Sequence, residues 1–290
     1  MKNYYLEESL YEGAGQYLEI KKVLVDKITS HQHLKIFDTF SPTHGRAMTL
    51  DGILQVTQGG NLPYHEYIAT LPTLVHGNVK RVLVIGASDG GVIRQLFRFK
   101  TIEKVVMVEI DEEVTDACRR YLPDVSENAF NDERLDLHFM DGRKYVEKTS
   151  NTFDLIIVDS TDPIGPGAAL FKEDFYEKCA LLLGKKGILI TQNGVPRFQA
   201  DELKDSIRFM NKLFSYASCY MGDMFDYPGA NMALGFASNY NYINDDVLKN
   251  VEILEQKLQK YGQAEKLQHL NAETIIAAFA LPNYVKKILT

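Results

Sequence analysis

The chain has 290 residues, of which 45% are hydrophobic and 24% are charged. This composition excludes a chain that is disordered, collagen-like or coiled-coil throughout, and a length near the upper end for one domain predicts two units. With 32 Lys and Arg against 39 Asp and Glu, the formal charge is -7, which disfavours nucleic acid as a partner and favours cationic ligands.

The cysteines and the apolar segments bear on the cellular compartment. Cys118, Cys179 and Cys219 are far apart and have no C-x-x-C spacing, so the sequence predicts neither a disulfide framework nor a metal site. No apolar run approaches the ~20 residues that cross a bilayer, and no basic-then-apolar leader opens the chain. We therefore expect a soluble cytoplasmic protein that does not bind membranes.

The first part of the chain predicts a small antiparallel β domain. Period-two or β-rich segments occur at 17–25, 34–40 and 46–57. The pair Gly59-Gly60 ends this pattern, and Pro63 lies where a helix can begin. We place the boundary near residue 61, so that an N-terminal β domain, 1–61, precedes a larger domain, 62–290.

The larger domain alternates predicted strands with predicted helices. The predicted strands are 81–86, 104–111, 135–142, 153–160 and 187–192, followed by two late strands, 216–220 and 231–238, that close the sheet. The predicted helices are 63–76, 91–99, 112–121 and 200–214, followed by a helical C-terminal stretch, 245–290. Strands this apolar, separated by helices, indicate an α/β fold with a parallel sheet that is covered on both faces.

Acidic residues follow four of the predicted strands. They are Asp89 after the first strand, Glu109 at the second, Asp141 at the third, and Asp159 at the fourth with Asp162 just beyond it. An aspartate at a strand end is also a common turn former or helix N-cap, and for Asp141 we give that interpretation about even weight. Since ligands of open α/β sheets bind beyond the carboxyl ends of the strands, five acids at this edge indicate a binding site.

The glycine-rich loop after the first strand selects among nucleotide ligands. It resembles a dinucleotide fingerprint, but Ser88 replaces the middle glycine and Asp89 lies inside the loop. A carboxylate there would repel a pyrophosphate, which makes NAD and FAD poor candidates. Glu109, roughly 20 residues further on, is placed to accept hydrogen bonds from ribose hydroxyls. An adenosyl sulfonium compound, which carries positive charge and no phosphate, satisfies both observations.

Seven segments together resemble the polyamine aminopropyltransferases, the spermidine synthase family. The segments are GRAMTLDGILQ at 45–55, YHE at 64–66, VLVIGASDGG at 82–91, VEID at 108–111, VDSTDPIGPG at 158–167, TQ at 191–192 and YP at 227–228. The resemblance implies a Rossmann-like, methyltransferase-type doubly wound sheet behind the small β domain. It also implies decarboxylated S-adenosylmethionine as co-substrate, no permanently bound cofactor, a cationic polyamine acceptor, and a homodimer or homotetramer.

The resemblance also implies roles for individual residues. On the donor side these are Gln55, His65 and Asp89 for the aminopropyl end, Glu109 for the ribose, Asp141 for the adenine amino group, and Gly86 in the loop. On the acceptor side they are Tyr64, Asp159, Asp162, Gln192 and Tyr227. Taken singly, Gln55, Tyr64, His65 and Tyr227 could equally be surface or packing residues.

The expected reaction is displacement at the carbon next to the sulfonium, which releases 5'-methylthioadenosine. An alkyl amine has a pKa of about 10.4 and is protonated at neutral pH, so it must lose a proton before it attacks. Asp159, with Tyr64 and a backbone carbonyl near Ser160, is the expected base, and Asp162 is expected to bind the acceptor as a cation. Residues 163–167 are interpreted as a gating loop, or alternatively as an ordinary proline-rich turn.

Four departures from the family pattern concern the choice of substrate. Gly60-Asn61 replaces an Asp-Glu pair, and Gly194 replaces a glutamate where the distal amine of putrescine would bind. Asp226 is an additional acid that could compensate in substrate binding, and Ala87 and Ser88 replace two glycines beside the donor. The acceptor is therefore putrescine or another amine, such as agmatine, cadaverine or a longer polyamine.

Two alternative functions stay open at this point. An enzyme could use S-adenosylmethionine itself to transfer a methyl or aminocarboxypropyl group, although Asp89 would repel the carboxylate of that donor. A non-catalytic relative could bind a nucleoside or polyamine as a sensor, although a binding module has no need of a base beside the amine.

Overall fold

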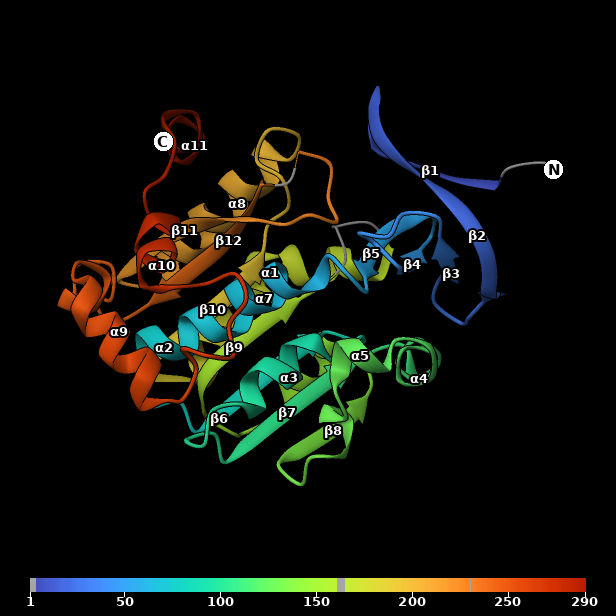
Figure 1. The fold of residues 1–290 in the computed structure, drawn as a ribbon. Helices are drawn as coiled ribbons and strands as arrows, with labels where there is room; N and C mark the ends of the chain where they lie inside the picture. Colours follow the sequence, from blue (N-terminus) through green and yellow to red (C-terminus); the bar gives the residue numbers. More distant parts are fainter. Residues whose placement is uncertain (1–3, 161–164, 230) are drawn as a thin grey trace.

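The computed structural model describes residues 4–160, 165–229 and 231–290, which form two β-sheets with helices packed around the larger one (Figure 1). Asp162 and Pro163, which the sequence assigns to acceptor binding and to the gating loop, lie outside the described residues. The smaller sheet is antiparallel with its strands in chain order: β1 (Tyr4–Tyr11), β2 (Ala14–Ile28), β3 (His33–Thr39), β4 (Arg46–Leu50) and β5 (Ile53–Thr57).

The larger sheet has seven strands in the order β11-β12-β10-β9-β6-β7-β8. Its strands are β6 (Arg81–Gly86), β7 (Lys104–Glu109), β8 (Leu135–Phe139), β9 (Phe153–Asp159), β10 (Leu183–Gln192), β11 (Tyr216–Asp223) and β12 (Asn231–Ser238). The pairs from β8 to β10 are parallel, whereas β12 pairs antiparallel with both β10 and β11. From β6 the chain continues to β7 and β8 on one side of β6 in the sheet, and then crosses to β9 on the other side. The topological switch point of the sheet therefore lies at β6.

Helices cover both faces of this sheet. The α-helices are α1 (Asn61–His65), α2 (Leu71–His76), α3 (Gly91–Phe97), α4 (Glu112–Tyr121), α5 (Pro123–Ser126), α6 (Gly142–Lys148), α7 (Glu173–Leu182), α8 (Ala200–Leu213), α9 (Val251–Lys260), α10 (Ala272–Ala278) and α11 (Asn283–Leu289). Other helical elements are the π-helical η1 (Glu66–Thr70) and the 3-10 helices η2 (Ala129–Asn131), η3 (Gly165–Phe171) and η4 (Asp246–Leu248).

Along each strand of the larger sheet the side chains point alternately to its two faces, and this gives a separate core on each face. In β6, Val82 and Val84 pack into the core under α2 and α3, whereas Leu83 and Ile85 pack into the core under α7 and α8. Adjacent side chains of a strand point to opposite faces, so a fully apolar strand has to be covered on both sides. The predicted doubly wound α/β class is confirmed, including the two late strands that close the sheet.

The helix predicted from Pro63 begins two residues earlier, at Asn61, and is not a uniform α-helix. Residues Glu66–Thr70 form a π-helical turn between α1 and α2. The buried Glu66 accepts hydrogen bonds from the backbone amides of Gln268, His269 and Leu270 at 2.8–3.0 Å. A distant contact of this kind has no local signature in the sequence.

The small sheet packs against α4 and α5 of the larger unit, as Figure 1 shows. Leu34, Ile36 and Met48 meet Val114 and Cys118 in a shared core. All three cysteines are buried and unbridged.

None of the helices in the described part of the chain is long and apolar enough to cross a membrane.

Candidate active site

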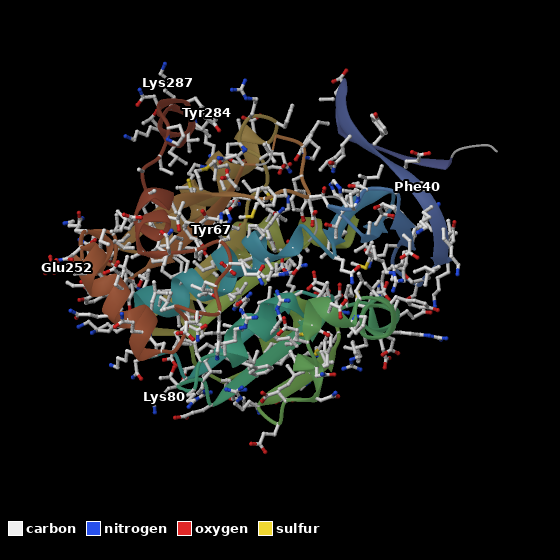
Figure 2. The ribbon with its side chains drawn as sticks, in the orientation of Figure 1. Phe40, Tyr67, Lys80, Glu252, Tyr284 and Lys287 are labelled. Atoms are coloured by element: carbon white, nitrogen blue, oxygen red, sulfur yellow. The ribbon has the colours of Figure 1, made fainter. Side chains whose placement is uncertain are left out.

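One cavity lies where the carboxyl ends of the central strands meet the small sheet. The predicted site residues that line it are Gln55, Tyr64, Gly86, Asp89, Glu109, Asp141, Asp159, Gln192 and Tyr227. Charged side chains such as Lys80, Glu252 and Lys287 lie at the periphery of the molecule (Figure 2). Three acids of the cavity, Asp89, Glu109 and Asp159, have pKa values that differ from their ordinary values.

Asp159 and Tyr64 form a hydrogen-bonded pair at the end of β9. The Tyr64 hydroxyl donates to Asp159 Oδ1. Burial, reinforced by the negative charge of Asp89, raises the pKa of Asp159 to about 6. Burial and the charge of Asp159 raise the pKa of Tyr64 well above its ordinary value, so the tyrosine remains a proton donor in the hydrogen bond.

Gly86 allows the ends of β6 and β9 to approach each other. Its φ is 88°, and a Cβ there would lie within 3.0 Å of the carbonyl oxygen of Asp159. The next amide, Ala87 N, donates to that same oxygen at 3.3 Å. Only glycine combines this left-handed conformation with so close an approach. Gly86 therefore helps to place the backbone that carries Asp159.

Asp89 is held from two sides in the loop between β6 and α3. Its Oδ1 accepts a hydrogen bond from Gly91 N at 2.7 Å, and its Oδ2 lies 3.3 Å from His65 Nε2. Burial by itself would raise the pKa of Asp89, but the His65 interaction and the Gly91 amide outweigh it and lower the pKa. The carboxylate is thus kept negative and suited to a cation. His65 does not line the main cavity and lies behind Asp89.

Glu109 ends β7 with a carboxylate that is bonded on one side only. Its Oε1 accepts from Ile110 N at 2.7 Å and from Asp111 N at 3.0 Å, and within the described residues Oε2 remains available to a ligand. Burial raises the pKa of Glu109 to about 7. A ligand that donates hydrogen bonds to Oε2 would stabilise the charged form.

Glu109→Gln is expected to raise stability and weaken ligand binding. The raised pKa means that the native state is penalised when Glu109 is ionised, so above pH 7 the neutral amide should add about 3 kcal/mol to the free energy of unfolding. Thermal unfolding at pH 8 and pH 5 measures this, with the gain shrinking at pH 5 where Glu109 is protonated. A lower midpoint for the variant at pH 8 contradicts the prediction.

Asp141 caps a helix and also lines the cavity. Its Oδ1 accepts from Arg143 N at 2.8 Å, which makes it the N-cap of α6. Asp141 also lines the cavity together with Gly142. Because a capping carboxylate is fixed in orientation, its position in the cavity is set by the start of α6.

Two polar atoms at the other end of the cavity are buried without a partner among the described residues. They are Gln192 Oε1 and Ser160 Oγ, and both residues line the cavity. An unpaired buried acceptor is costly unless a ligand satisfies it. Tyr227 lies beside them, with its hydroxyl donating to the carbonyl oxygen of Gln55 at 3.2 Å. This end therefore offers acceptors and aromatic rings to a hydrogen-bond donor.

Comparisons with known proteins match this architecture over nearly the whole chain. A family model described as "Spermine/spermidine synthase domain" matches residues 61–246, and one described as "Spermidine synthase tetramerisation domain" matches residues 4–58. The chain belongs to the spermine/spermidine synthase family. The predicted family and enzyme class, a transferase of alkyl groups, are confirmed.

Relatives and solved structures of this family resemble the chain closely. A polyamine aminopropyltransferase of Ruegeria sp. (strain TM1040) is 42% identical over 97% of this chain and 96% of the relative. Polyamine aminopropyltransferase 1 of Pseudomonas aeruginosa is 41% identical over 96% of this chain and 95% of the relative. A spermidine synthase in complex with the transition state analogue AdoDATO is 33% identical, with a TM-score of 0.91 over 100% of this chain and 96% of that one. The spermidine synthase from Thermotoga maritima is also 33% identical, with a TM-score of 0.89 over 100% and 95%.

Two of the departures from the family pattern have a structural explanation. Gly194 has a φ of 65°, and a Cβ there would lie within 3.0 Å of the amide of Gln199. That amide accepts from Val195 N and from the Tyr11 hydroxyl, both at 2.9 Å. The neutral side chain of Gln199, the residue just before α8, therefore fills the space that a side chain at position 194 would need.

Asp226, the additional acid that could compensate in substrate binding, lines a small neighbouring cavity and not the main one. Its carboxylate accepts from Thr57 N at 2.8 Å and from Thr57 Oγ1 at 2.6 Å. A Cβ at Gly60 would lie within 3.0 Å of this carboxylate. Asp226 thus joins β5 to the segment that carries Tyr227, in a small neighbouring cavity shared with Tyr64.

The sequence interpretation missed Gln32. It lies in the turn between β2 and β3, lines the cavity, and its Nε2 donates to Asp111 Oδ2 at 3.2 Å. Met48 and Leu50 supply apolar wall from the same sheet. A single glutamine in a polar turn carries no local signal, and only the packing of the small sheet brings it to the site.

Within the described residues no cluster of His, Cys, Asp or Glu could hold a metal ion.

Proposed function

We propose that this enzyme transfers an aminopropyl group from decarboxylated S-adenosylmethionine to an amine acceptor and releases 5'-methylthioadenosine. The observation that carries the proposal is the partly buried Asp159–Tyr64 pair in one cavity with Asp89 and Glu109. The names of the relatives and the AdoDATO complex of a similar structure support it. No permanently bound cofactor takes part, because the donor is consumed as a co-substrate.

The donor would lie along the ends of β6, β7 and β8. In this arrangement Glu109 binds the ribose, Asp141 the adenine amino group, and Asp89 the aminopropyl ammonium with His65 and Gln55 nearby. Gly86 gives the donor access to the backbone of the loop. The pKa of Asp89 is lowered, so this carboxylate is negative and suits a cationic nucleoside. The pKa of Glu109 is raised to about 7, and hydrogen bonds donated by a ligand would favour its charged form.

The chemical step needs a neutral amine. The lone pair of the amine attacks the carbon next to the sulfonium, and the bond between that carbon and sulfur breaks. The electron pair of the broken bond stays on sulfur, in neutral methylthioadenosine. The proton that the amine gives up goes to Asp159 and from there to solvent. Tyr64, which donates to Oδ1, orients the carboxylate. With a pKa of about 6, Asp159 is a stronger base than an ordinary carboxylate and is still mostly ionised at neutral pH.

The acceptor would lie against Gln192, Tyr227 and Asp159, with Asp162 as a further cation ligand. The unpartnered Oε1 of Gln192 suits an ammonium donor. Since Gln199 presents a neutral amide at position 194, the distal end of this pocket carries no carboxylate there. Putrescine, agmatine, cadaverine and a longer polyamine are therefore the acceptors to compare, with Asp226 as a more remote negative charge.

Turnover is expected to fall as the pH drops through about 6. The pKa of Asp159 is raised to about 6, so below that pH the carboxyl is protonated and cannot accept the proton of the amine. Initial rates between pH 4.5 and pH 8, with both substrates saturating, measure this dependence. A rate that stays constant down to about pH 4 would remove Asp159 from the role of base.

The function is tested by incubating the protein with decarboxylated or intact S-adenosylmethionine and each amine, and identifying products by mass spectrometry. Methylthioadenosine together with an amine enlarged by an aminopropyl group supports the proposal. S-Adenosylhomocysteine indicates methyl transfer instead, and methylthioadenosine with an aminocarboxypropyl product indicates the carboxylated donor. Tight binding with no turnover indicates a sensor.

We also propose an assembly and a compartment. Residues 1–61 would form an oligomerisation domain of a homodimer or homotetramer, and residues 62–290 the catalytic domain. The match of 4–58 to a tetramerisation domain supports this, as do the exposed Tyr17, Ile28 and Phe40 on the small sheet. Three buried, unbridged cysteines are typical of the reducing cytoplasm, which we propose as its location.

A further inference from the structure

The segment between β11 and β12 binds the edge of the small sheet. Among the described strands β5 is the last of that sheet, and an edge strand carries main-chain groups that need partners. Two consecutive residues of the segment supply them: the carboxylate of Asp226 accepts from Thr57 N at 2.8 Å, and the Tyr227 hydroxyl donates to the carbonyl oxygen of Gln55 at 3.2 Å. Main-chain groups two residues apart in a strand face the same side, so the two contacts together fix the segment along β5.

The hydroxyl of Thr57 connects this segment to the start of α1. It donates to Asp226 Oδ1 at 2.6 Å and accepts from Gly60 N at 2.9 Å, two roles that one hydroxyl can fill at once. Gly60 is the residue before α1, the helix that carries Tyr64. The φ of Gly60 is -97°, so a side chain at position 60 is excluded by the space that the Asp226 carboxylate fills and not by the backbone conformation.

Tyr64 and Tyr227 lie beside each other in the wall of the main cavity, with their ring centroids 6.3 Å apart. Tyr64 has anchors of its own: its hydroxyl donates to Asp159, and Asn61 fixes the start of α1 by donating to the carbonyl oxygens of residues 57 and 58. Tyr227 lies in a turn, which its N–H closes by donating to the carbonyl oxygen of Met224 at 3.2 Å. The position of this turn relative to α1 therefore follows from its contact with β5.

We propose that Asp226 is a positioning residue for the amine acceptor: by binding Thr57 it sets where Tyr227 lies relative to Tyr64 at the acceptor end of the cavity. That an amine binds there rests on the proposed function. Asp226 lines the small neighbouring cavity and not the main one, so it acts through Tyr227. Its contribution is the pair of hydrogen bonds to Thr57, whereas an attraction between its negative charge and the acceptor is the alternative that the experiments separate.

Fluorine NMR of the unliganded protein, labelled with 3-fluorotyrosine, tests the position of Tyr227. Its signal is assigned by its absence in Tyr227→Phe. Thr57→Val keeps the shape of the side chain but removes the hydroxyl that donates to Asp226, and it is expected to shift the Tyr227 signal, as is Asp226→Ala. Thr57→Ser, the matched control, keeps the hydroxyl and should keep the signal in place. Asp223→Asn, which removes an exposed acid of the neighbouring strand end, should also leave it in place.

A Tyr227 signal that stays in place in Thr57→Val overturns the proposal. Because Thr57→Val breaks the same contact from the side of β5, the test survives if Asp226→Ala fails to fold. It also needs no substrate, so an error in the proposed function leaves its outcome unchanged.

Steady-state kinetics tests the consequence for the acceptor, with the best substrate among putrescine, agmatine and cadaverine. Asp226→Ala is expected to raise the KM of this amine about tenfold, the scale of one lost hydrogen bond to a charged group, while kcat and the KM of the donor change less than about threefold. Asp226→Asn should keep the KM of the amine within about threefold of the wild type, because its amide can still accept from Thr57 N and donate to the Thr57 hydroxyl.

Two kinetic outcomes overturn the proposal. If the KM of the amine is as high in Asp226→Asn as in Asp226→Ala, the negative charge attracts the acceptor and the hydrogen bonds do not position Tyr227. The second outcome concerns the double variant. Since Asp226 acts through Tyr227, adding Asp226→Ala to Tyr227→Ala should change the KM less than about threefold, and a further tenfold rise means that Asp226 acts by another route.

Discussion

Asp159→Asn is expected to lower turnover about 10²-fold or more and to leave the protein folded. The amide keeps the shape of the side chain and can still accept from the Tyr64 hydroxyl, but it cannot take the proton of the amine. Because burial opposes the charge of Asp159 and raises its pKa to about 6, removing the charge should not lower stability at pH 8.

Single-turnover rates at saturating substrates and thermal unfolding of the same preparation measure the two effects. Tyr64→Phe is the matched control, since it removes the hydroxyl next to Asp159 and keeps the carboxylate. Its loss of turnover should be smaller than that of Asp159→Asn. Near-normal turnover in folded Asp159→Asn would exclude Asp159 as the base, whereas a lower thermal midpoint would show that the carboxylate is structural.

Gly86→Ala is expected to lower the free energy of unfolding by about 3 kcal/mol or more. Two costs add at this position: a φ of 88° that disfavours a side chain, and a methyl group placed within 3.0 Å of the carbonyl oxygen of Asp159. That oxygen belongs to the backbone, so relief requires β6 and β9 to move apart. Turnover should fall as well, because the displaced residue carries the base.

Gly52→Ala separates the two costs. Gly52 has a φ of 82°, but no atom lies within 4 Å of a Cβ built there. Its substitution should therefore cost only about 1 kcal/mol and leave turnover unchanged. Urea unfolding of both variants makes the comparison. Equal losses of unfolding free energy in Gly86→Ala and Gly52→Ala would mean that the contact with the Asp159 carbonyl oxygen contributes nothing. The end of β6 would then not depend on a glycine at position 86.

The strands and the acids that follow them could be predicted from local sequence. An apolar run bounded by a glycine loop or an aspartate marks a buried strand and its carboxyl end, and parallel strands place those ends at one edge. This reasoning alone led from Asp89, Glu109 and Asp159 to one cavity. The π-helical turn at Glu66–Thr70 was not predictable, because its carboxylate is held by amides more than 200 residues away.

The contacts of Asp226 and Gln32 could not be predicted from local sequence patterns. Asp226 was singled out only as an acid that could compensate in substrate binding, and its hydrogen bond with Thr57, 169 positions away in the chain, could not be predicted. Gln32 reaches the cavity from a polar turn because the small sheet packs against α4 and α5. Neither residue has a neighbour in the sequence that indicates its contact.

The sequence by itself determined the α/β architecture, the ligand edge of the sheet, and a negative site suited to cationic substrates. These follow from periodicity and from residues at strand ends, which are local properties of the chain. Only the tertiary structure decided which acids are removed from solvent and in which direction their pKa values move. Burial and hydrogen-bond direction depend on atoms brought together from distant segments, so they exist only once the chain has folded.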